Sequence, residues 1–341
     1  MAVTISDVAK KAGVSTSTVS KVLNHWTTIS DATCKKVEAA ITELQYTPNA
    51  TAVSFAKKNT HNIVYLTSLE KGGAYHNPHM FDIMCGVQSE LAKRQYSLTL
   101  IDTSLDSYPG ESVAKVISRK NADGLIIHGS AISKEETVSI IQKEQFPHII
   151  IGHPGFDSTL CWIDTNHGLA GQYAAKHMIA CGYTKTAFIG GRKTDYISCQ
   201  RLKGFLGTMH EFGYTVPAEY IGYTGSTMAE SCEFTLKLMA LPSDKRPQAI
   251  ICENNTIALG VAKALRRLQL SVPAEIAFLT FDSYPYSEII EPSPTIVDID
   301  VYDMGVQAGN LMLRKLENPT LLVQSYTTLP VIIQGKTTCG E

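Results

Sequence analysis

Residues 3–24 read VTISDVAKKAGVSTSTVSKVLN, a stretch with two short helical patterns on either side of a glycine. Thr4 and Asp7 fit the start of a helix, because the hydroxyl can accept an unpaired amide and the acid lies in the favourable first turn. Apolar residues then recur at helical spacing as far as Gly13, whose backbone freedom suits a tight turn. A second helix is expected to follow over about Thr16–Asn24.

Two helices joined by a glycine turn form a helix-turn-helix, whose second helix enters the DNA major groove. Ser15 is a suitable N-cap for that second helix, and a third helix is expected over about Ser30–Leu44. The outward side chains of the second helix are three small hydroxyls and a lysine, which can reach base edges or phosphates: Thr16, Ser17, Ser20 and Lys21. Periodicity alone leaves open a plain three-helix bundle with a polar face.

The stretch resembles the opening of the LacI/GalR family of bacterial regulators, whose pattern is T-I-x-D-V-A-x-x-A-G-V-S-x-x-T-V-S-x-V-L-N. The resemblance implies a sequence-specific DNA-binding transcription regulator. It also implies that Thr16 and Ser17 are the main base readers, and that Lys21 and Asn24 contact bases or backbone.

The charge distribution agrees with a DNA-binding end. Residues 1–60 carry seven lysines and no arginine against four acidic residues, whereas the rest of the chain carries 23 basic and 28 acidic residues. A length of 341 residues predicts two or three domains, and 44% apolar with 18% charged residues is typical of a soluble protein. The sequence shows neither a signal peptide nor an apolar stretch long enough to span a membrane, so we expect a cytoplasmic protein.

The eight cysteines are widely spaced, with no C-x-x-C and no cysteine–histidine cluster at zinc spacing. This pattern favours unpaired thiols in a reducing compartment. His76 and His79 lack a third ligand, so no metal and no cofactor are expected.

The next segment, residues 48–60, resembles the family hinge P-N-x-x-A-R-S-L, beginning at Pro48 and Asn49. In that family, paired hinge helices of a dimer enter the minor groove and a leucine wedges between base steps. Phe55 occupies the wedge position, and Val53 replaces the usual arginine, which removes a minor-groove cation. The alternative is that Phe55 packs on the body of the protein.

From residue 62 onward, short apolar runs alternate with helical lengths, which predicts parallel sheets covered on both faces. The expected strands are 63–66, 97–101, 124–127, 148–151, 186–189, 249–252 and 277–281. The fold class is therefore an α/β body of two doubly wound parallel-sheet subdomains after a small all-α domain. We place the helix-turn-helix domain at 1–47, the hinge at 48–60 and the effector-binding and dimerisation domain at 61–341. Its first subdomain comprises 61–162 plus 294–325, and its second comprises 163–293 plus 326–341.

Ligands of such folds lie at the carboxyl ends of the strands, where Asp282 ends a buried strand. Arg201 begins a helix, where the dipole disfavours a cation unless it has an anionic or ligand partner. The two side chains could grip adjacent hydroxyls, with Arg201 donating and Asp282 accepting, and Asn254 could do both. The alternative is a structural Arg201–Asp282 salt bridge.

The body also resembles the family, at R-x-x-G-F (201–205), N-D-x-M-A-L-G (254–260) and G-x-D-[DN] (280–283). The resemblance implies a periplasmic-binding-protein-like fold, a dimer, and effector contacts from Arg201, Asn254 and Asp282. It places His79, Met80 and Thr227 where the family usually has aromatic ligand contacts. Fewer aromatic platforms leave a polyol, a phosphorylated sugar or another metabolite open beside a sugar.

Enzyme signatures such as G-x-G-x-x-G, G-x-S-x-G and H-E-x-x-H are missing, so we expect no catalytic residues. A transport binding protein would need an export signal and no DNA module. We therefore expect a homodimeric repressor that binds a pseudo-palindromic double-stranded operator and responds to a small, carbohydrate-like effector, with no membrane partner. The alternatives are control by a protein partner, activation, or dependence on a corepressor.

Overall fold

The computed structural model describes residues 3–23, 28–46, 59–69, 79–129, 134–156, 159–283 and 287–339. The chain divides into two compact units, residues 1–61 and 62–341. Three residues predicted to contact DNA lie outside the described ranges, namely Asn24, Asn49 and Phe55.

The first unit is a three-helix domain of α1 (Ile5–Ala12), α2 (Thr16–Leu23) and α3 (Asp31–Leu44). The predicted capping box is present, since Asp7 N donates to Thr4 Oγ1 and Thr4 N donates to Asp7 Oδ2 at 2.9 Å. Hydrogen bonds from Thr4 hold the pKa of Asp7 below its ordinary value.

Each helix of the first unit contributes one fully buried valine to a shared core, namely Val8, Val19 and Val37. Gly13 ends α1 with a φ of 68°, a left-handed conformation that favours glycine. This unit therefore has its own core, which fixes the face that α2 presents outward.

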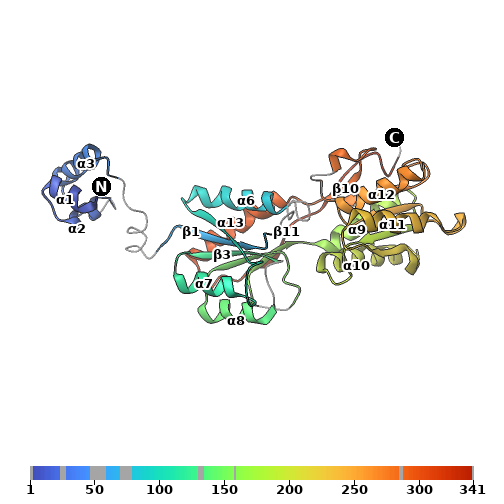
Figure 1. Ribbon diagram of the computed structural model, residues 1–341, viewed down its shortest axis with the longest axis horizontal. Helices are drawn as coiled ribbons and strands as arrows, with labels where there is room; N and C mark the ends of the chain where they lie inside the picture. The colour runs from blue at the N-terminus through green and yellow to red at the C-terminus, as the bar shows by residue number, and fades with distance from the viewer. Residues whose placement is uncertain are drawn as a thin grey trace. The chain divides into compact units, whose positions relative to one another are not determined.

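The second unit contains two six-stranded sheets (Figure 1). The first has the strand order β11-β5-β4-β3-β1-β2, and all its pairs are parallel. Its strands are β1 (Asn62–Thr67), β2 (Ser97–Asp102), β3 (Gly124–His128), β4 (His148–Ile151), β5 (Trp162–Thr165) and β11 (Gln324–Thr328).

The second sheet has the order β12-β10-β9-β8-β6-β7. It is parallel except for β12, which runs antiparallel to β10. Its strands are β6 (Thr186–Gly190), β7 (Ile221–Tyr223), β8 (Ala249–Cys252), β9 (Ala277–Phe281), β10 (Thr295–Asp298) and β12 (Val331–Ile333).

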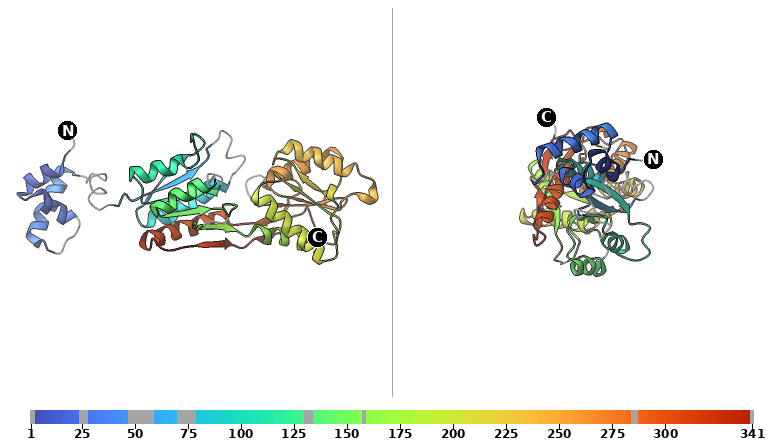
Figure 2. Two further views of the ribbon diagram at one scale, coloured as in Figure 1. Left: turned by 90° about the horizontal axis from the view of Figure 1, so that it is seen from below. Right: turned by 90° about the vertical axis from the view of Figure 1, so that its left-hand side faces the viewer.

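Helices cover both faces of each sheet, as predicted (Figure 2). The helices of the first sheet are α6 (His79–Lys93), α7 (Glu111–Arg119), α8 (Lys134–Glu144) and α13 (Val301–Glu317). Those of the second are α9 (His167–Ala180), α10 (Tyr196–Glu211), α11 (Met228–Met239) and α12 (Asn255–Arg267). Successive strand residues enter opposite cores: Ile63 packs with α6 and α13, whereas Val64 packs with α7 and α8.

The strands divide between the sheets differently from the predicted subdomains. The predicted first subdomain includes 294–325, but β10 pairs with β9 in the second sheet. Similarly, β5 and β11 continue the first sheet to Thr165 and Thr328, past the predicted boundaries at 162 and 325. Apolar runs reveal strands but do not reveal which of two sheets a strand joins. The sequence analysis also did not predict α13, whose buried Val301, Met304, Ala308 and Met312 pack on the first sheet.

The expectation that all the cysteines are unpaired is wrong for two of them. Cys181 and Cys339 form a disulfide with a Cα–Cα distance of 5.6 Å, although 158 residues separate them in the sequence. Such a separation carries no spacing signal, so only the tertiary fold reveals the pair. The other six cysteines are free. Among the described residues, no helix is both long and apolar enough to cross a membrane.

A matched pair of glycines in α10 tests the close packing of α9 on α10. A side chain at Gly204 would overlap the backbone of Gly168 in α9, whereas Gly207 has open space. We expect Gly204→Ala to lower the free energy of unfolding by about 1–3 kcal/mol through overpacking. Gly207→Ala should raise it by about 0.4–1 kcal/mol, because alanine restricts the unfolded chain. Urea denaturation of both variants measures the difference, and equal effects would contradict the packing.

Candidate DNA-binding and effector-binding sites

The outward face of α2 is polar, as the sequence predicts. Thr16, Ser17 and Lys21 are exposed and Ser20 is half-buried, while the opposite face is buried in the core of the first unit. Ser15 fixes the start of the helix, since its Oγ accepts a hydrogen bond from Thr18 N at 3.2 Å. The helix N-terminus therefore lies beside small hydroxyls, an arrangement that suits contact with phosphates and base edges.

Arg201 and Asp282 meet at the carboxyl edge of the second sheet. The prediction that Arg201 begins a helix is wrong, because α10 begins at Tyr196 and Arg201 lies in its second turn. Arg201 is 3% exposed, and its Nη2 is 3.4 Å from Asp282 Oδ1. Its Nη1 donates to the carbonyl of Glu253 at 2.5 Å, and its guanidinium carbon lies 4.2 Å from the ring centroid of Phe281. Burial alone would raise the pKa of Asp282, but the charge of Arg201, together with His79 and His167, outweighs burial and holds that pKa well below its ordinary range. The carboxyl group is therefore ionised.

The guanidinium of Arg201 is incompletely paired. The 3.4 Å separation exceeds the roughly 2.7–2.9 Å of a strong charge-assisted hydrogen bond. Its Nε is buried and has no hydrogen-bond partner among the described residues. A buried N–H without a partner is costly, which a ligand acceptor would relieve. The ion pair that was the alternative interpretation is present, and it leaves donor capacity unused.

His79 lies in the same cluster, although its helix packs on the first sheet. It begins α6, and its Nε2 lies 3.7 Å from Asp282 Oδ2. Burial would lower its pKa, but the hydrogen bond and charge of Asp282 outweigh burial and raise the pKa above the ordinary value. The structure thus brings together three of the six predicted effector residues, namely His79, Arg201 and Asp282.

Asn254 and Thr227 lie near each other, and both cap helices. Asn254 Oδ1 accepts from Ile257 N at 3.0 Å at the start of α12, and its Nδ2 donates to Ser226 Oγ at 3.3 Å. Thr227 Oγ1 accepts from Glu230 N at 3.2 Å at the start of α11. One acceptor of each side chain is therefore already engaged in holding a helix N-terminus.

Met80 lies at the carboxyl end of β1, where its Sδ accepts from Thr67 Oγ1 at 3.2 Å. It is therefore placed at the strand edge of the first sheet. This contact joins Met80 to β1 rather than to the Arg201–Asp282 pair.

Two buried carboxylates were not assigned as site residues from the sequence. Glu253 follows β8 and accepts from Gly191 N at 2.7 Å and from Ser198 Oγ. Asp164, in β5, accepts from His153 N at 2.9 Å and lies 3.3 Å from His167 Nε2. Polar residues at the ends of apolar strands were the signal that could have identified both.

An aromatic cluster was also missed. The ring of His153 stacks on Tyr196 at 4.5 Å and meets Trp162 edge-on at 4.8 Å. Tyr326 packs against Trp162 with a centroid distance of 5.4 Å. The cluster therefore joins strands of the first sheet to Tyr196 of α10, a helix of the second sheet. Burial raises the pKa of Tyr196 above its ordinary value. The positions of His79, Met80 and Thr227 carry no aromatic ring that could stack on a sugar. The cluster of His153, Trp162, Tyr196 and Tyr326 does provide such rings.

Two protein-family profiles match this arrangement. The profile for bacterial regulatory proteins of the lacI family matches residues 4–49, and the profile for a periplasmic binding protein-like domain matches residues 175–338. The ribose operon repressor of Escherichia coli (strain K12) is 30% identical over 331 residues, which are 97% of this chain and 98% of the relative. The chain belongs to the LacI family of bacterial regulatory proteins.

A further relative and two solved structures are also similar to this chain. The transcriptional repressor PurR of Actinobacillus pleuropneumoniae serotype 3 (strain JL03) is 30% identical over 314 residues, 92% of this chain and 91% of the relative. A Lac repressor dimer bound to operator has a TM-score of 0.83 at 21% identity and covers the whole of both chains. The regulator CelR in complex with cellobiose has a TM-score of 0.72 at 21% identity, covering 98% of this chain and 99% of that one.

The relatives confirm the predicted class. The LacI-type domain and the repressor relatives make the chain a DNA-binding transcription regulator rather than an enzyme. The solved structures confirm the fold, two parallel-sheet subdomains behind a helix-turn-helix domain.

Proposed function

We propose that this LacI-family chain is a dimeric repressor that binds a pseudo-palindromic operator through α2 and releases it when a small carbohydrate-like effector binds the second unit. The observation that carries the effector assignment is the buried Arg201–Asp282 pair with an unsatisfied Arg201 Nε. A ligand that bears adjacent hydroxyls can accept from Arg201 and donate to Asp282, which pairs both charged groups at once. His79 supplies a third polar contact from the opposite side of the cluster.

The remaining effector contacts are assigned to Met80, Thr227 and Asn254, which lie at the strand edges of the two sheets. The names of the relatives support a sugar or a related metabolite. One relative is a ribose operon repressor, and one solved regulator from Enterococcus faecium holds ribose. Induction by release fits those repressors better than control by a protein partner, activation or a corepressor.

The DNA contacts are assigned to the exposed face of α2, through Thr16, Ser17, Ser20 and Lys21. Asn24, Asn49 and Phe55 complete the proposed set, with Phe55 as a minor-groove wedge between paired hinges. A domain boundary after residue 47 and a hinge over 48–60 accord with this division of roles. Because its target is the bacterial operator, we place the protein in the cytoplasm.

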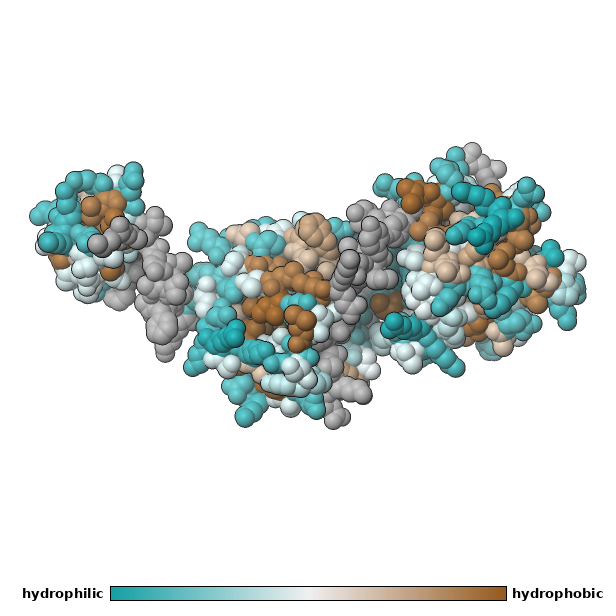
Figure 3. Space-filling model, in the orientation of Figure 1, coloured by the Kyte–Doolittle hydropathy of each residue, from teal (hydrophilic) through white to brown (hydrophobic). Residues whose placement is uncertain are grey.

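Dimerisation is assigned to the second unit. Figure 3 shows apolar surface on the part of this unit that carries the first sheet. Large apolar side chains exposed there include Phe81 of α6, Leu100 of the edge strand β2, and Leu105. Exposed apolar surface of this kind marks association sites, and a two-fold dimer presents two α2 helices to two half-sites.

Two substitutions in α2 separate base reading from phosphate contact. Ser17→Ala should weaken operator binding by about 1–3 kcal/mol and relax sequence preference at one position in each half-site. Lys21→Ala should weaken binding to all sequences and reduce the slope of log affinity against log salt by about one per subunit. Fluorescence anisotropy on selected and scrambled duplexes at several salt concentrations measures both effects.

Lys203→Ala is the matched control for the charge change, because Lys203 is exposed on α10 in the other unit. It should leave the salt slope unchanged. If Ser17→Ala and Lys21→Ala behave like this control, α2 does not contact DNA.

A further inference from the structure

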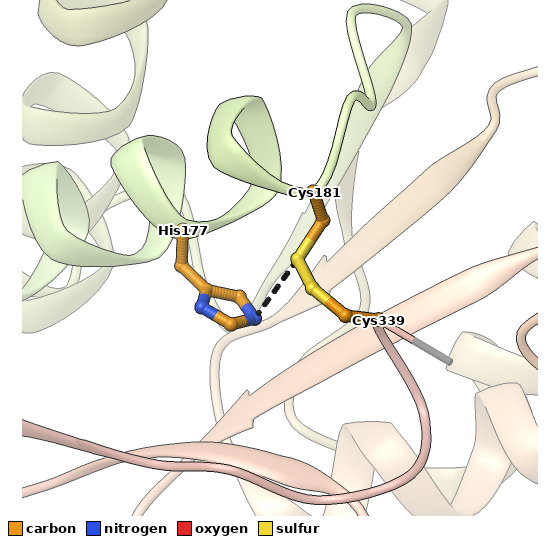
Figure 4. A group of neighbouring side chains, drawn as sticks. All are labelled: His177, Cys181 and Cys339. Carbon is orange, nitrogen blue, oxygen red and sulfur yellow. Dashed lines mark hydrogen bonds between the residues drawn. A yellow bond between two sulfur atoms is a disulfide. The ribbon is translucent and has the colours of Figure 1, made fainter. Parts of the chain in front are cut away.

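The disulfide lies in a cluster with a histidine, at a place that the proposed DNA and effector sites do not use. His177 and Cys181 are four residues apart at the end of α9, which places them on one face of the helix. Cys339 comes from the C-terminal segment. Figure 4 shows the imidazole of His177 directed at the disulfide, with its Nε2 3.5 Å from Cys181 Sγ.

Hydrogen bonds hold the C-terminal segment beside α9 independently of the disulfide. Thr338 accepts from Tyr183 Oη through its carbonyl at 2.5 Å, and its hydroxyl lies 2.9 Å from His177 Nε2. Thr337 Oγ1 accepts from Thr295 N at 2.9 Å, and both threonines of the segment are fully buried. The two sulfur atoms should therefore stay close together when the disulfide is reduced.

The three side chains match the ligands that Zn²⁺ prefers. The Nε2 or Nδ1 of His177 and the Sγ atoms of Cys181 and Cys339 all lie within 4.8 Å of one another. Zn–S bonds of about 2.3 Å and Zn–N bonds of about 2.0–2.1 Å place two ligands of one ion no more than about 4.6 Å apart. After reduction, the two sulfur atoms must move apart from bonding distance to become two ligands of one ion, while His177 Nε2 already lies 3.5 Å from Cys181 Sγ. Across the described parts of the chain, this is the one group of three such ligands.

The position of His177 also suits a ligand. Neutral imidazole is a common metal ligand, and the Nε2 of His177 faces the sulfur atoms. The site has three protein ligands, so the fourth position of a tetrahedral ion is left for water.

We propose that His177, Cys181 and Cys339 form a Zn²⁺ site that is available when the Cys181–Cys339 disulfide is reduced. A dithiol reductant breaks the S–S bond by thiol–disulfide exchange, is itself oxidised to a disulfide, and leaves two protein thiols. Zn²⁺ then displaces the two thiol protons and binds two thiolates and the neutral imidazole. In the reverse direction, a low-molecular-weight disulfide accepts two electrons from the thiolates, re-forms the protein disulfide and releases the ion.

Zinc and the disulfide are therefore mutually exclusive links between the C-terminal segment and α9. Either the disulfide or the bound ion joins the C-terminal segment to α9. In the reduced, metal-free protein, only the hydrogen bonds join them. The site therefore binds zinc only in the thiol form.

Co²⁺ titration of the full chain tests this site, because thiolate ligands give Co²⁺ an intense charge-transfer absorption. After reduction with a phosphine and anaerobic desalting, the wild type should develop this band with one equivalent of Co²⁺ and lose it to Zn²⁺. Cys181→Ser and Cys339→Ser should lack the band, and His177→Gln should bind at least about tenfold more weakly. Cys199→Ser, which removes an exposed free cysteine of α10, should behave like the wild type.

Oxidation by glutathione disulfide should release the zinc, and mass spectrometry of the digested protein should then find Cys181 linked to Cys339. A band in Cys339→Ser equal to that of the wild type would overturn the proposal. So would a reduced wild type without the band, or an oxidised wild type that keeps its zinc.

Discussion

Deletion of residues 1–61 is expected to reduce affinity for the operator by at least about 10³-fold, to the level of non-specific binding or below it. The reason is that the side chains of α2 that we propose as base readers belong to a unit with its own core of Val8, Val19 and Val37. Residues 62–341 form a separate compact unit, so they should remain folded and keep their ligand affinity. Anisotropy on an operator selected from random duplexes measures the first effect, and thermal denaturation measures the second.

The full-length chain with Lys203→Ala controls for handling and charge. Operator affinity retained by residues 62–341 would contradict the assignment of DNA binding to α2. Loss of the cooperative melting transition would instead mean that the second unit depends on the first.

Arg201→Ala is expected to abolish the effector response while the chain still binds operator. The substitution removes the proposed donor to the ligand and leaves the ionised Asp282 buried without its guanidinium partner. Removing one partner of a buried ion pair costs about 3–5 kcal/mol, so the melting temperature of the second unit should also fall. Operator titrations with and without ligand measure the response, and denaturation measures the stability.

The double variant Arg201→Met with Asp282→Asn separates these two effects. It removes both charges, so it should be more stable than either Arg201→Ala or Arg201→Met alone. It should still fail to respond to the ligand, because neither hydroxyl contact can form. If Arg201→Ala responds normally to the ligand, or if the neutral double variant regains the response, the Arg201–Asp282 ion pair is purely structural.

The parts of the fold that depend on local pattern could be predicted from the sequence. Thr4 and Asp7 form the expected capping box, and Gly13 takes the left-handed conformation that ends α1. These features depend on residues three to five positions apart, which a sequence displays directly. The seven expected strands of the body are also present. Six of them are continuous buried runs, whereas the edge strand β2 is largely exposed.

The parts that depend on distant contacts could not be predicted. Nothing near Cys181 in the sequence points to Cys339, and the strand β10 gives no sign that it joins the second sheet. At the effector cluster, His79, Arg201 and Asp282 were all predicted, but only the tertiary fold reveals that His79 Nε2 lies 3.7 Å from the carboxylate of Asp282. The stack of His153 on Tyr196 brings together a loop and the first residue of α10, which only the tertiary fold places side by side. The helix α13 is an exception among the elements that were not predicted, because its apolar residues recur at helical spacing in the sequence itself.

The central claim is that ligand binding in the second unit controls operator binding by the first. A thermal-shift screen of residues 62–341 against sugars, polyols and their phosphates identifies ligands, because a bound ligand raises apparent stability. The decisive measurement is the operator affinity of the full-length chain with and without a ligand found in this way. The account predicts that the ligand weakens operator binding by about 5–150-fold, the usual range of allosteric coupling. Operator affinity unchanged by every ligand that stabilises the second unit would contradict it.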